Sequence, residues 1–133
     1  MLESVVPRRV LVVDDNVDAA ELVGEIMSMQ GYTVTVVNGG HDALAAVAGF
    51  LPDVVFLDIG MPEMDGYEVA SALRRDPRLE AARIVALTAW GDPASRARAI
   101  ACGFDAHLVK PANLDKLLYE AAAHRSAHIG ALD

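Results

Sequence analysis

Five polar residues in this chain directly follow short apolar runs, and their chemical types suit metal or phosphate chemistry. They are, in chain order, Asp14, Asp15, Asp58, Thr88 and Lys110. An aspartate after an apolar run is often only a helix N-cap, which would account for Asp14 or Asp15 alone. A cap does not account for Asp58, which precedes a loop rich in glycine and proline, nor for a lysine in the same kind of position.

The three aspartates, if they meet, form a site that needs a cation. Two carboxylates about 5 Å apart repel by roughly 3 kcal/mol at an effective dielectric constant near 20. Such a site must hold a proton or bind a metal ion. An all-oxygen site with few protein ligands suits Mg²⁺. Lys110 offsets part of the charge and can act as a point charge toward phosphate, and Thr88 offers a hydroxyl donor to a phosphoryl oxygen.

The elements that must position these residues alternate along the chain. Short runs rich in valine and isoleucine predict buried strands. The predicted strands are Val10–Val13, Tyr32–Val37, Val54–Leu57, Ile84–Leu87 and Ala106–Val109. Apolar residues at helical spacing follow each run, from about Ala19 to Gly31, over Asp42–Gly49, from about Val69 to Arg75, from Pro93 to about Cys102, and over Leu114–Ala122.

This alternation predicts a single-domain, doubly wound α/β fold, in which five helices cover both faces of a five-stranded parallel sheet. Ligands bind such sheets at the carboxyl ends of the strands, so we expect the five polar residues to meet at one edge. The glycine- and proline-rich segment at residues 60–66 is expected to be a loop. We expect residues 8–124 to form the domain, residues 1–7 an N-terminal extension and residues 125–133 a C-terminal tail.

Composition narrows the function classes. The chain has 133 residues, enough for one domain, and a formal net charge of −8, which argues against a nucleic-acid-binding surface. Its single cysteine, Cys102, excludes an internal disulfide and a cysteine-rich zinc site. No signal peptide is visible and no apolar stretch approaches the roughly 18 residues that span a bilayer. We therefore expect a cytoplasmic protein that contacts neither membrane nor nucleic acid directly.

The ordered set of motifs resembles the receiver domain of two-component response regulators over about residues 8–124. The set comprises Asp14-Asp15, Asp58 within Val-Phe-Leu-Asp-Ile-Gly-Met-Pro-Glu-Met-Asp-Gly, Thr88-Ala89 and Lys110-Pro111. The resemblance implies a flavodoxin-like, receiver-type fold. It also implies a signalling function, in which a partner's phosphohistidine transfers its phosphoryl group to the chain in a Mg²⁺-dependent reaction. The domain would be a phosphoacceptor that assists only its own phosphorylation and dephosphorylation, and not an enzyme.

The resemblance assigns roles to individual residues. Asp58 would accept the phosphoryl group, while Lys110 and Thr88 would contact it. The Mg²⁺ ligands would be Asp14, Asp15, Asp58 and the backbone carbonyl of Gly60.

The resemblance also identifies a switch and a rim. Thr88 would move toward the phosphoryl group and the residue three before the lysine would turn inward behind it; that residue is His107, where the family more commonly has tyrosine or phenylalanine. Trp90 and Ala89 would form the rim of the site, and we expect Trp90 to shield the acyl phosphate. The Lys110–Pro111 peptide bond is expected to be cis, as in the family.

The expected partners are a sensor histidine kinase or a histidine phosphotransfer protein, and a downstream protein target. The target would contact the face formed by the fourth helix, fifth strand and fifth helix, where the sequence offers Arg96, Arg98 and His107. Whether the receiver is free-standing or part of a larger protein stays open.

Three other functions remain as alternatives. A receiver that only docks partners would need no phosphorylation. A haloacid-dehalogenase-type, Mg²⁺-dependent phosphatase would place a second aspartate where Gly60 stands. A nucleotide-binding module would need a glycine- or hydroxyl-rich loop after the first strand, where the chain has Asp14-Asp15-Asn16.

Overall fold

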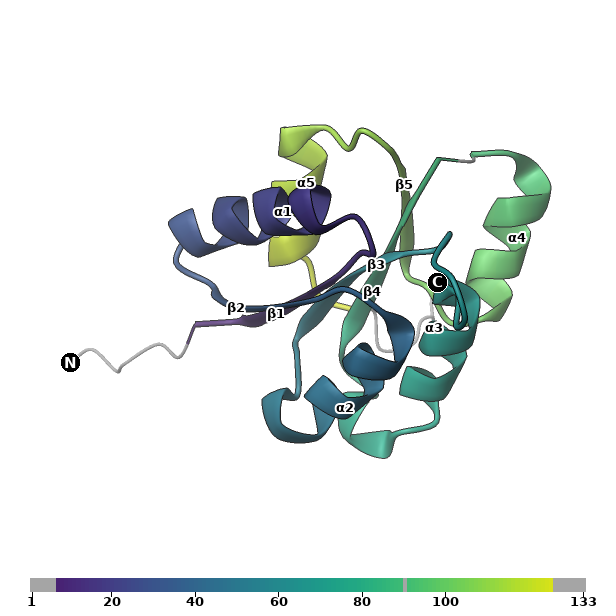
Figure 1. Cartoon of the computed structure of the whole chain (residues 1–133), viewed down its shortest axis with the longest axis horizontal. Helices are drawn as coiled ribbons and strands as arrows, with labels where there is room; N and C mark the ends of the chain where they lie inside the picture. Colours follow the sequence, from purple (N-terminus) through teal and green to yellow (C-terminus); the bar gives the residue numbers. More distant parts are fainter. Residues whose placement is uncertain (1–6, 90, 126–133) are drawn as a thin grey trace.

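The computed structural model describes residues 7–89 and 91–125, which form alternating strands and helices (Figure 1). In chain order the elements are β1 (Arg9–Val13), α1 (Val17–Met29), β2 (Thr33–Val37), α2 (Gly40–Phe50), β3 (Val54–Asp58), α3 (Gly66–Arg74), the 3-10 helix η1 (Pro77–Leu79), β4 (Arg83–Thr88), α4 (Pro93–Ala101), β5 (Ala106–Val109) and α5 (Leu114–Ala122). Among the described helices, none has the length and apolar character needed to cross a membrane.

The five strands form one parallel sheet in the order β2-β1-β3-β4-β5, which confirms the predicted doubly wound fold. The chain runs outward from β1 to β2 and then crosses back to β3, so the winding direction reverses between β1 and β3. In open α/β sheets this reversal leaves a crevice at the carboxyl ends of the two strands. The acidic residues predicted to act together follow or end these two strands.

Helices cover both faces of the sheet. Figure 1 shows α1 and α5 on one face and α2, α3 and α4 on the other. Alternate strand residues point to opposite faces and build two separate cores. Val10, Val12 and Phe56 pack with residues of α1 and α5, whereas Leu11 and Leu57 pack with residues of α2, α3 and α4. The central strands are apolar throughout because both of their faces are buried.

The boundaries of some elements differ from the sequence predictions. β3 and β4 each continue one residue further, through Asp58 and Thr88, because these two residues still pair in register with Leu87 and Val109 of the neighbouring strands. α2 begins at Gly40, two residues before the predicted start at Asp42. The short helix η1 was not predicted; the Asp76 side chain caps it by accepting a hydrogen bond from the Arg78 N–H, with Pro77 at the first turn.

The loop after Asp58 is held in place by close backbone packing at Gly66. A Cβ atom on Gly66 would lie 2.6 Å from the Asp58 carbonyl oxygen and 2.7 Å from the Ile59 Cα. We therefore expect Gly66→Ala to lower the free energy of unfolding by about 1–3 kcal/mol, because backbone must shift to admit the methyl group. Urea denaturation measures this change.

Gly49 provides the matched control for this substitution, because it lies within α2 and a Cβ atom there meets nothing within 4 Å. Gly49→Ala should raise the free energy of unfolding by about 0.5–1 kcal/mol through helix propensity. Equal effects of the two substitutions would contradict the packing explanation.

Candidate functional site

The three predicted acidic residues meet at the carboxyl ends of β1 and β3. One carboxylate oxygen from each of Asp14, Asp15 and Asp58 lies within 4.8 Å of the others. Asp14 is 2% exposed and Asp58 is 6% exposed, while Asp15 lies at the surface. The cluster therefore has two buried carboxylates and one that reaches solvent.

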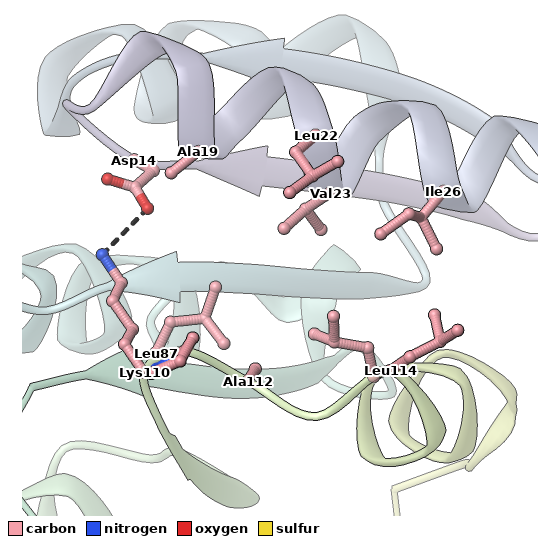
Figure 2. Close-up of a pocket in the computed structure, with 11 residues that line it drawn as sticks. Asp14, Ala19, Leu22, Val23, Ile26, Leu87, Lys110, Ala112 and Leu114 are labelled. Atoms are coloured by element: carbon pink, nitrogen blue, oxygen red, sulfur yellow. Dashed lines mark hydrogen bonds and ion pairs between the residues drawn. The ribbon is translucent and has the colours of Figure 1, made fainter.

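Lys110 directly follows the edge strand β5, and its side chain reaches this cluster across the carboxyl end of the sheet. Its Nζ atom lies 3.0 Å from Asp14 Oδ2 and 3.3 Å from Asp58 Oδ1. Figure 2 shows the lysine side chain extending to the Asp14 carboxylate. Burial alone would lower the pKa of Lys110, but hydrogen bonds and charge from Asp14 and Asp58 outweigh it and raise that pKa. The ammonium group is therefore firmly protonated.

Asp58 is the carboxylate whose proton affinity is most changed. Its pKa rises from 3.8 to about 6, first because burial disfavours the charged form and second because Asp14 is a nearby like charge. Lys110 opposes both effects without cancelling them. The charged site is thus costly in the absence of further positive charge. Three clustered carboxylates are hard oxygen donors, so the residues present fit a divalent cation such as Mg²⁺.

Backbone and side-chain hydrogen bonds orient the acidic groups. The Asn16 N–H donates to Asp14 Oδ1 at 3.0 Å, and the Gly60 N–H donates to Asp58 Oδ1 at 3.3 Å. The N-cap of α1 is Asn16, whose side chain accepts from the Ala19 N–H. Helix capping therefore does not account for the two aspartates before it.

Asn38 belongs to the site and was missed by the sequence analysis. Its Nδ2 donates to the Asp14 backbone carbonyl at 2.9 Å, from the loop after β2. The sequence did place Asn38 at the end of the second predicted strand, which was the available signal. Nothing in the residue type showed that it would support the acidic cluster.

Thr88 lies at the end of β4, next to the cluster. It is buried and paired in register with Val109, and its carbonyl oxygen accepts a hydrogen bond from the Lys110 N–H at 2.7 Å. The Lys110–Pro111 peptide bond is cis. Ala89 is exposed directly after Thr88. Trp90, the other predicted rim residue, lies outside the described residues.

His107 lies on β5 and is half-buried. Its neighbours Ala106 and Leu108 pack toward α1 and α5, so alternation directs the His107 side chain toward the face covered by α4. Neither ring nitrogen has a hydrogen-bond partner among the described residues. Burial and then the charge of Arg96 lower the pKa of His107, while Asp92 opposes this change. These surroundings therefore favour the neutral form of the imidazole.

An apolar cavity of about 370 Å³ opens beside the acidic cluster. Figure 2 shows Leu22, Val23 and Ile26 of α1 facing Leu87, Ala112 and Leu114 across it, with Asp14 and Lys110 at one end. These residues come from segments far apart in the chain, so sequence patterns could not reveal the cavity.

Comparison with known proteins places this geometry in one family. The family model described as "Response regulator receiver domain" matches residues 10–122. A probable transcriptional regulator, ycf27, of Guillardia theta is 40% identical over 103 residues, covering 77% of this chain and 39% of the relative. Response regulator MprA of Mycolicibacterium vanbaalenii is 38% identical over 112 residues, covering 84% of this chain and 48% of the relative. The matched segment thus spans less than half of either relative.

Solved structures agree with the sequence matches. The chemotaxis response regulator CheY4 of Vibrio cholerae superposes with a TM-score of 0.80 and 32% identity, covering 85% of this chain and 94% of that chain. A response regulator from Chloroflexus aurantiacus gives a TM-score of 0.79 with 31% identity, covering 85% and 93%. With the acidic cluster and the 2-1-3-4-5 sheet, these matches show that the chain belongs to the response regulator receiver domain family.

Proposed function

We propose that this chain is a phosphorylation-activated signalling receiver that accepts a phosphoryl group on Asp58 from a phosphohistidine of a partner protein. The observation that supports this most strongly is the position of Asp58, which is 6% exposed, belongs to a cluster of three carboxylates and has Lys110 Nζ 3.3 Å from its Oδ1. A buried carboxylate with a neighbouring cation suits nucleophilic attack on a group that carries its own negative charge. Residues 8–124 would form the receiver unit.

In the proposed transfer, a carboxylate oxygen of Asp58 forms a bond to phosphorus while the bond from phosphorus to the histidine nitrogen breaks. The histidine nitrogen keeps the electron pair. Lys110, already beside Asp58, neutralises charge on the phosphoryl oxygens, and the Thr88 hydroxyl donates a hydrogen bond to one of them after transfer. Catalysis is then largely positioning and electrostatic stabilisation.

Mg²⁺ is the proposed cofactor, held by Asp14, Asp15, Asp58 and the Gly60 carbonyl. When bound, it would supply positive charge that offsets the repulsion between these carboxylates and the incoming phosphoryl group. The chemistry of the donor set supports this proposal, because all the ligands are oxygen atoms. The raised pKa of Asp58 supports it as well, because a cation would stabilise its ionised form.

The proposed donors are a sensor histidine kinase or a histidine phosphotransfer protein. The apolar cavity beside Asp14 and Lys110 offers such a donor a surface next to the acceptor. The proposed output is a change in Thr88 and His107 that alters the face formed by α4, β5 and α5. Among the residues of these elements, Ile100 of α4 is 73% exposed and Tyr119 of α5 is 68% exposed, which supports a protein partner there.

The rival functions fit the site less well. A phosphatase of the haloacid-dehalogenase type needs an acid two residues after the nucleophile, and that residue is Gly60, which has no side chain. A receiver that only docks partners would not need a buried carboxylate cluster with a lysine beside it.

The test is phosphorylation of the full chain by a small-molecule donor, acetyl phosphate, followed by intact-mass spectrometry with and without Mg²⁺. We expect one phosphoryl group on the wild type when Mg²⁺ is present and none on Asp58→Asn. Asp115→Asn, an exposed position on α5, is the matched control and should behave as wild type. No phosphorylation of the wild type by either acetyl phosphate or a phosphorylated histidine kinase would favour the docking alternative. Repeated turnover of a phosphomonoester would favour the phosphatase.

A further inference from the structure

A second groove lies on the opposite side of α1 from the apolar cavity, along the edge of the sheet. It has a volume of about 660 Å³ and lies between α1 and the edge strand β2. Its lining residues are Glu21, Gly24, Glu25, Ser28 and Met29 of α1 with Val34 and Val36 of β2. None of its lining residues belongs to the acidic cluster, so the proposed phosphorylation chemistry does not account for it.

The edge strand presents unused backbone groups to this groove. The Thr33 N–H donates to the Arg8 carbonyl, and the Val37 carbonyl accepts from the Asp14 N–H. In a parallel ladder a residue directs its N–H and C=O to the same side, and successive residues alternate. Val34 and Val36 therefore direct theirs outward, where no other described strand pairs with β2.

β2 also lacks three of the features by which proteins protect an edge strand, namely a charged residue, a proline and a bulge. Its sequence, Thr-Val-Thr-Val-Val, contains no charge and no proline, and the strand pairs with β1 residue for residue without a bulge. Natural edges usually carry one of these devices to prevent pairing with another chain. An edge without them is suited to accept an added strand.

The α1 wall of the groove determines what such a strand would carry. Glu21 and Glu25 are exposed one turn apart, and neither forms an ion pair within the described ranges. α1 contains no basic residue, so the two like charges repel without compensation. Gly24 lets the helix approach closely, because a Cβ atom there would lie 2.7 Å from Val36 Cγ2. The carboxylates thus stand beside the edge strand.

We propose that this groove binds an extended basic segment of a partner protein, which adds a strand beside β2 and carries lysine or arginine at alternate positions. Alternate residues of a strand point to one face and lie about 6.6 Å apart. Residues four apart in a helix are about 6 Å apart along its axis, so Glu21 and Glu25 match that spacing. A second copy of this chain fits poorly, because it would bring its own acidic α1 and a net charge of −8.

The experiment measures binding of a labelled synthetic peptide of alternating lysine and threonine to the full chain by fluorescence anisotropy. The comparison peptide has the same composition with its lysines in one block. The alternating peptide should bind more tightly, and its affinity should fall with added salt. The double variant Glu21→Lys/Glu25→Lys should bind it about tenfold more weakly or worse, since two exposed ion pairs are lost and replaced by repulsion.

Two further variants separate strand addition from simple charge attraction. Val34→Pro removes an outward N–H without touching the β1 ladder and should weaken binding by about tenfold although the charge is unchanged. Glu80→Lys/Asp115→Lys makes the same charge change at exposed positions elsewhere and should leave the affinity within about twofold. If Val34→Pro proves unfolded, slower amide hydrogen exchange at Val34 and Val36 on adding peptide replaces it.

Several outcomes would overturn the proposal. Equal binding of the block peptide, or equal loss in the Glu80/Asp115 control, would mean that only net charge matters. If the wild type binds neither peptide, the proposed site does not exist. If light scattering shows a dimer of the wild type and Val34→Pro abolishes it, the edge of β2 serves self-association instead. Asp58→Asn should bind the peptide as wild type does, so the result is independent of the proposed phosphorylation.

Discussion

Asp58→Asn is expected to stabilise the metal-free protein at pH 7 by roughly 1–3 kcal/mol, although it removes the proposed phosphoacceptor. The reason is the raised pKa of Asp58, which moves from 3.8 to about 6, chiefly through burial and the charge of Asp14. Above that pKa the folded protein must hold an ionised carboxylate in an environment that disfavours it. Asparagine has a similar shape without the charge, so the cost disappears.

The pH dependence of this effect has a definite sign. Between about pH 4 and pH 6 the folded state keeps a proton on Asp58 that the unfolded state has released, so the stability contributed by this group falls as the pH rises. The difference between variant and wild type should therefore be small at pH 4, grow up to about pH 6 and stay constant above it. Urea denaturation at a series of pH values measures it.

Two comparisons check the interpretation of this stabilisation. Asp115→Asn, at an exposed position, should change the free energy of unfolding by less than about 0.5 kcal/mol at every pH. Added Mg²⁺ should stabilise the wild type more than Asp58→Asn, because a ligand that binds the folded state raises its apparent stability. If Asp58→Asn proved less stable than wild type at pH 7, or the difference did not vary with pH, the assignment of a strained carboxylate would be wrong.

The second large effect is expected for Lys110→Met, which should slow phosphorylation by acetyl phosphate about 100- to 1,000-fold. Lys110 is the group that contacts both buried carboxylates, with its Nζ 3.0 Å from Asp14 Oδ2 and 3.3 Å from Asp58 Oδ1. Methionine keeps much of the side-chain volume and removes the charge that would stabilise the phosphoryl oxygens in the transition state. Rates are measured by intact-mass spectrometry over time at saturating Mg²⁺.

The same substitution should raise the affinity for Mg²⁺, although it lowers the rate of phosphorylation. An ammonium group beside the carboxylates competes with a divalent cation, so its removal should tighten Mg²⁺ binding by about tenfold. Isothermal titration calorimetry of the unphosphorylated protein measures this. Lys116→Met removes the other lysine of the chain, at an exposed position on α5, and should change neither quantity. Weaker Mg²⁺ binding by Lys110→Met would contradict the competition between the ammonium group and the cation.

Much of the fold could be predicted from the sequence because its signals are local. Short valine-rich runs and helical spacing identified the five strands and five α-helices of the described residues, and the alternation implied a parallel sheet with the polar residues at one edge. The position of Asp58 directly after a buried run was enough to place it at that edge. The start of α2 could not be predicted from the local sequence. Gly40 begins this helix in close contact with Met64 and Val69, and only a residue without a side chain fits there.

The tertiary structure decided which groups act together and how strongly. Lys110 and Asp14 are 96 residues apart in the chain, yet share a hydrogen bond, and Asn38 supports Asp14 from a third strand end. Arg125, the first residue of the predicted tail, donates to Asp105 Oδ1 and is therefore tied to the domain.

Residue types and their order were sufficient to predict the sheet, the edge where the polar residues meet and the family resemblance. The reason is that a polar residue directly follows each predicted strand. Other features depend on distances between segments that are remote in sequence. They are the burial that raises the pKa of Asp58, the apolar cavity on one side of α1 and the groove on its other side. Local patterns contain no measure of those distances. The residues of the acidic cluster were therefore visible in the sequence, whereas the raised pKa of Asp58 and the spaces on either side of α1 were set by packing.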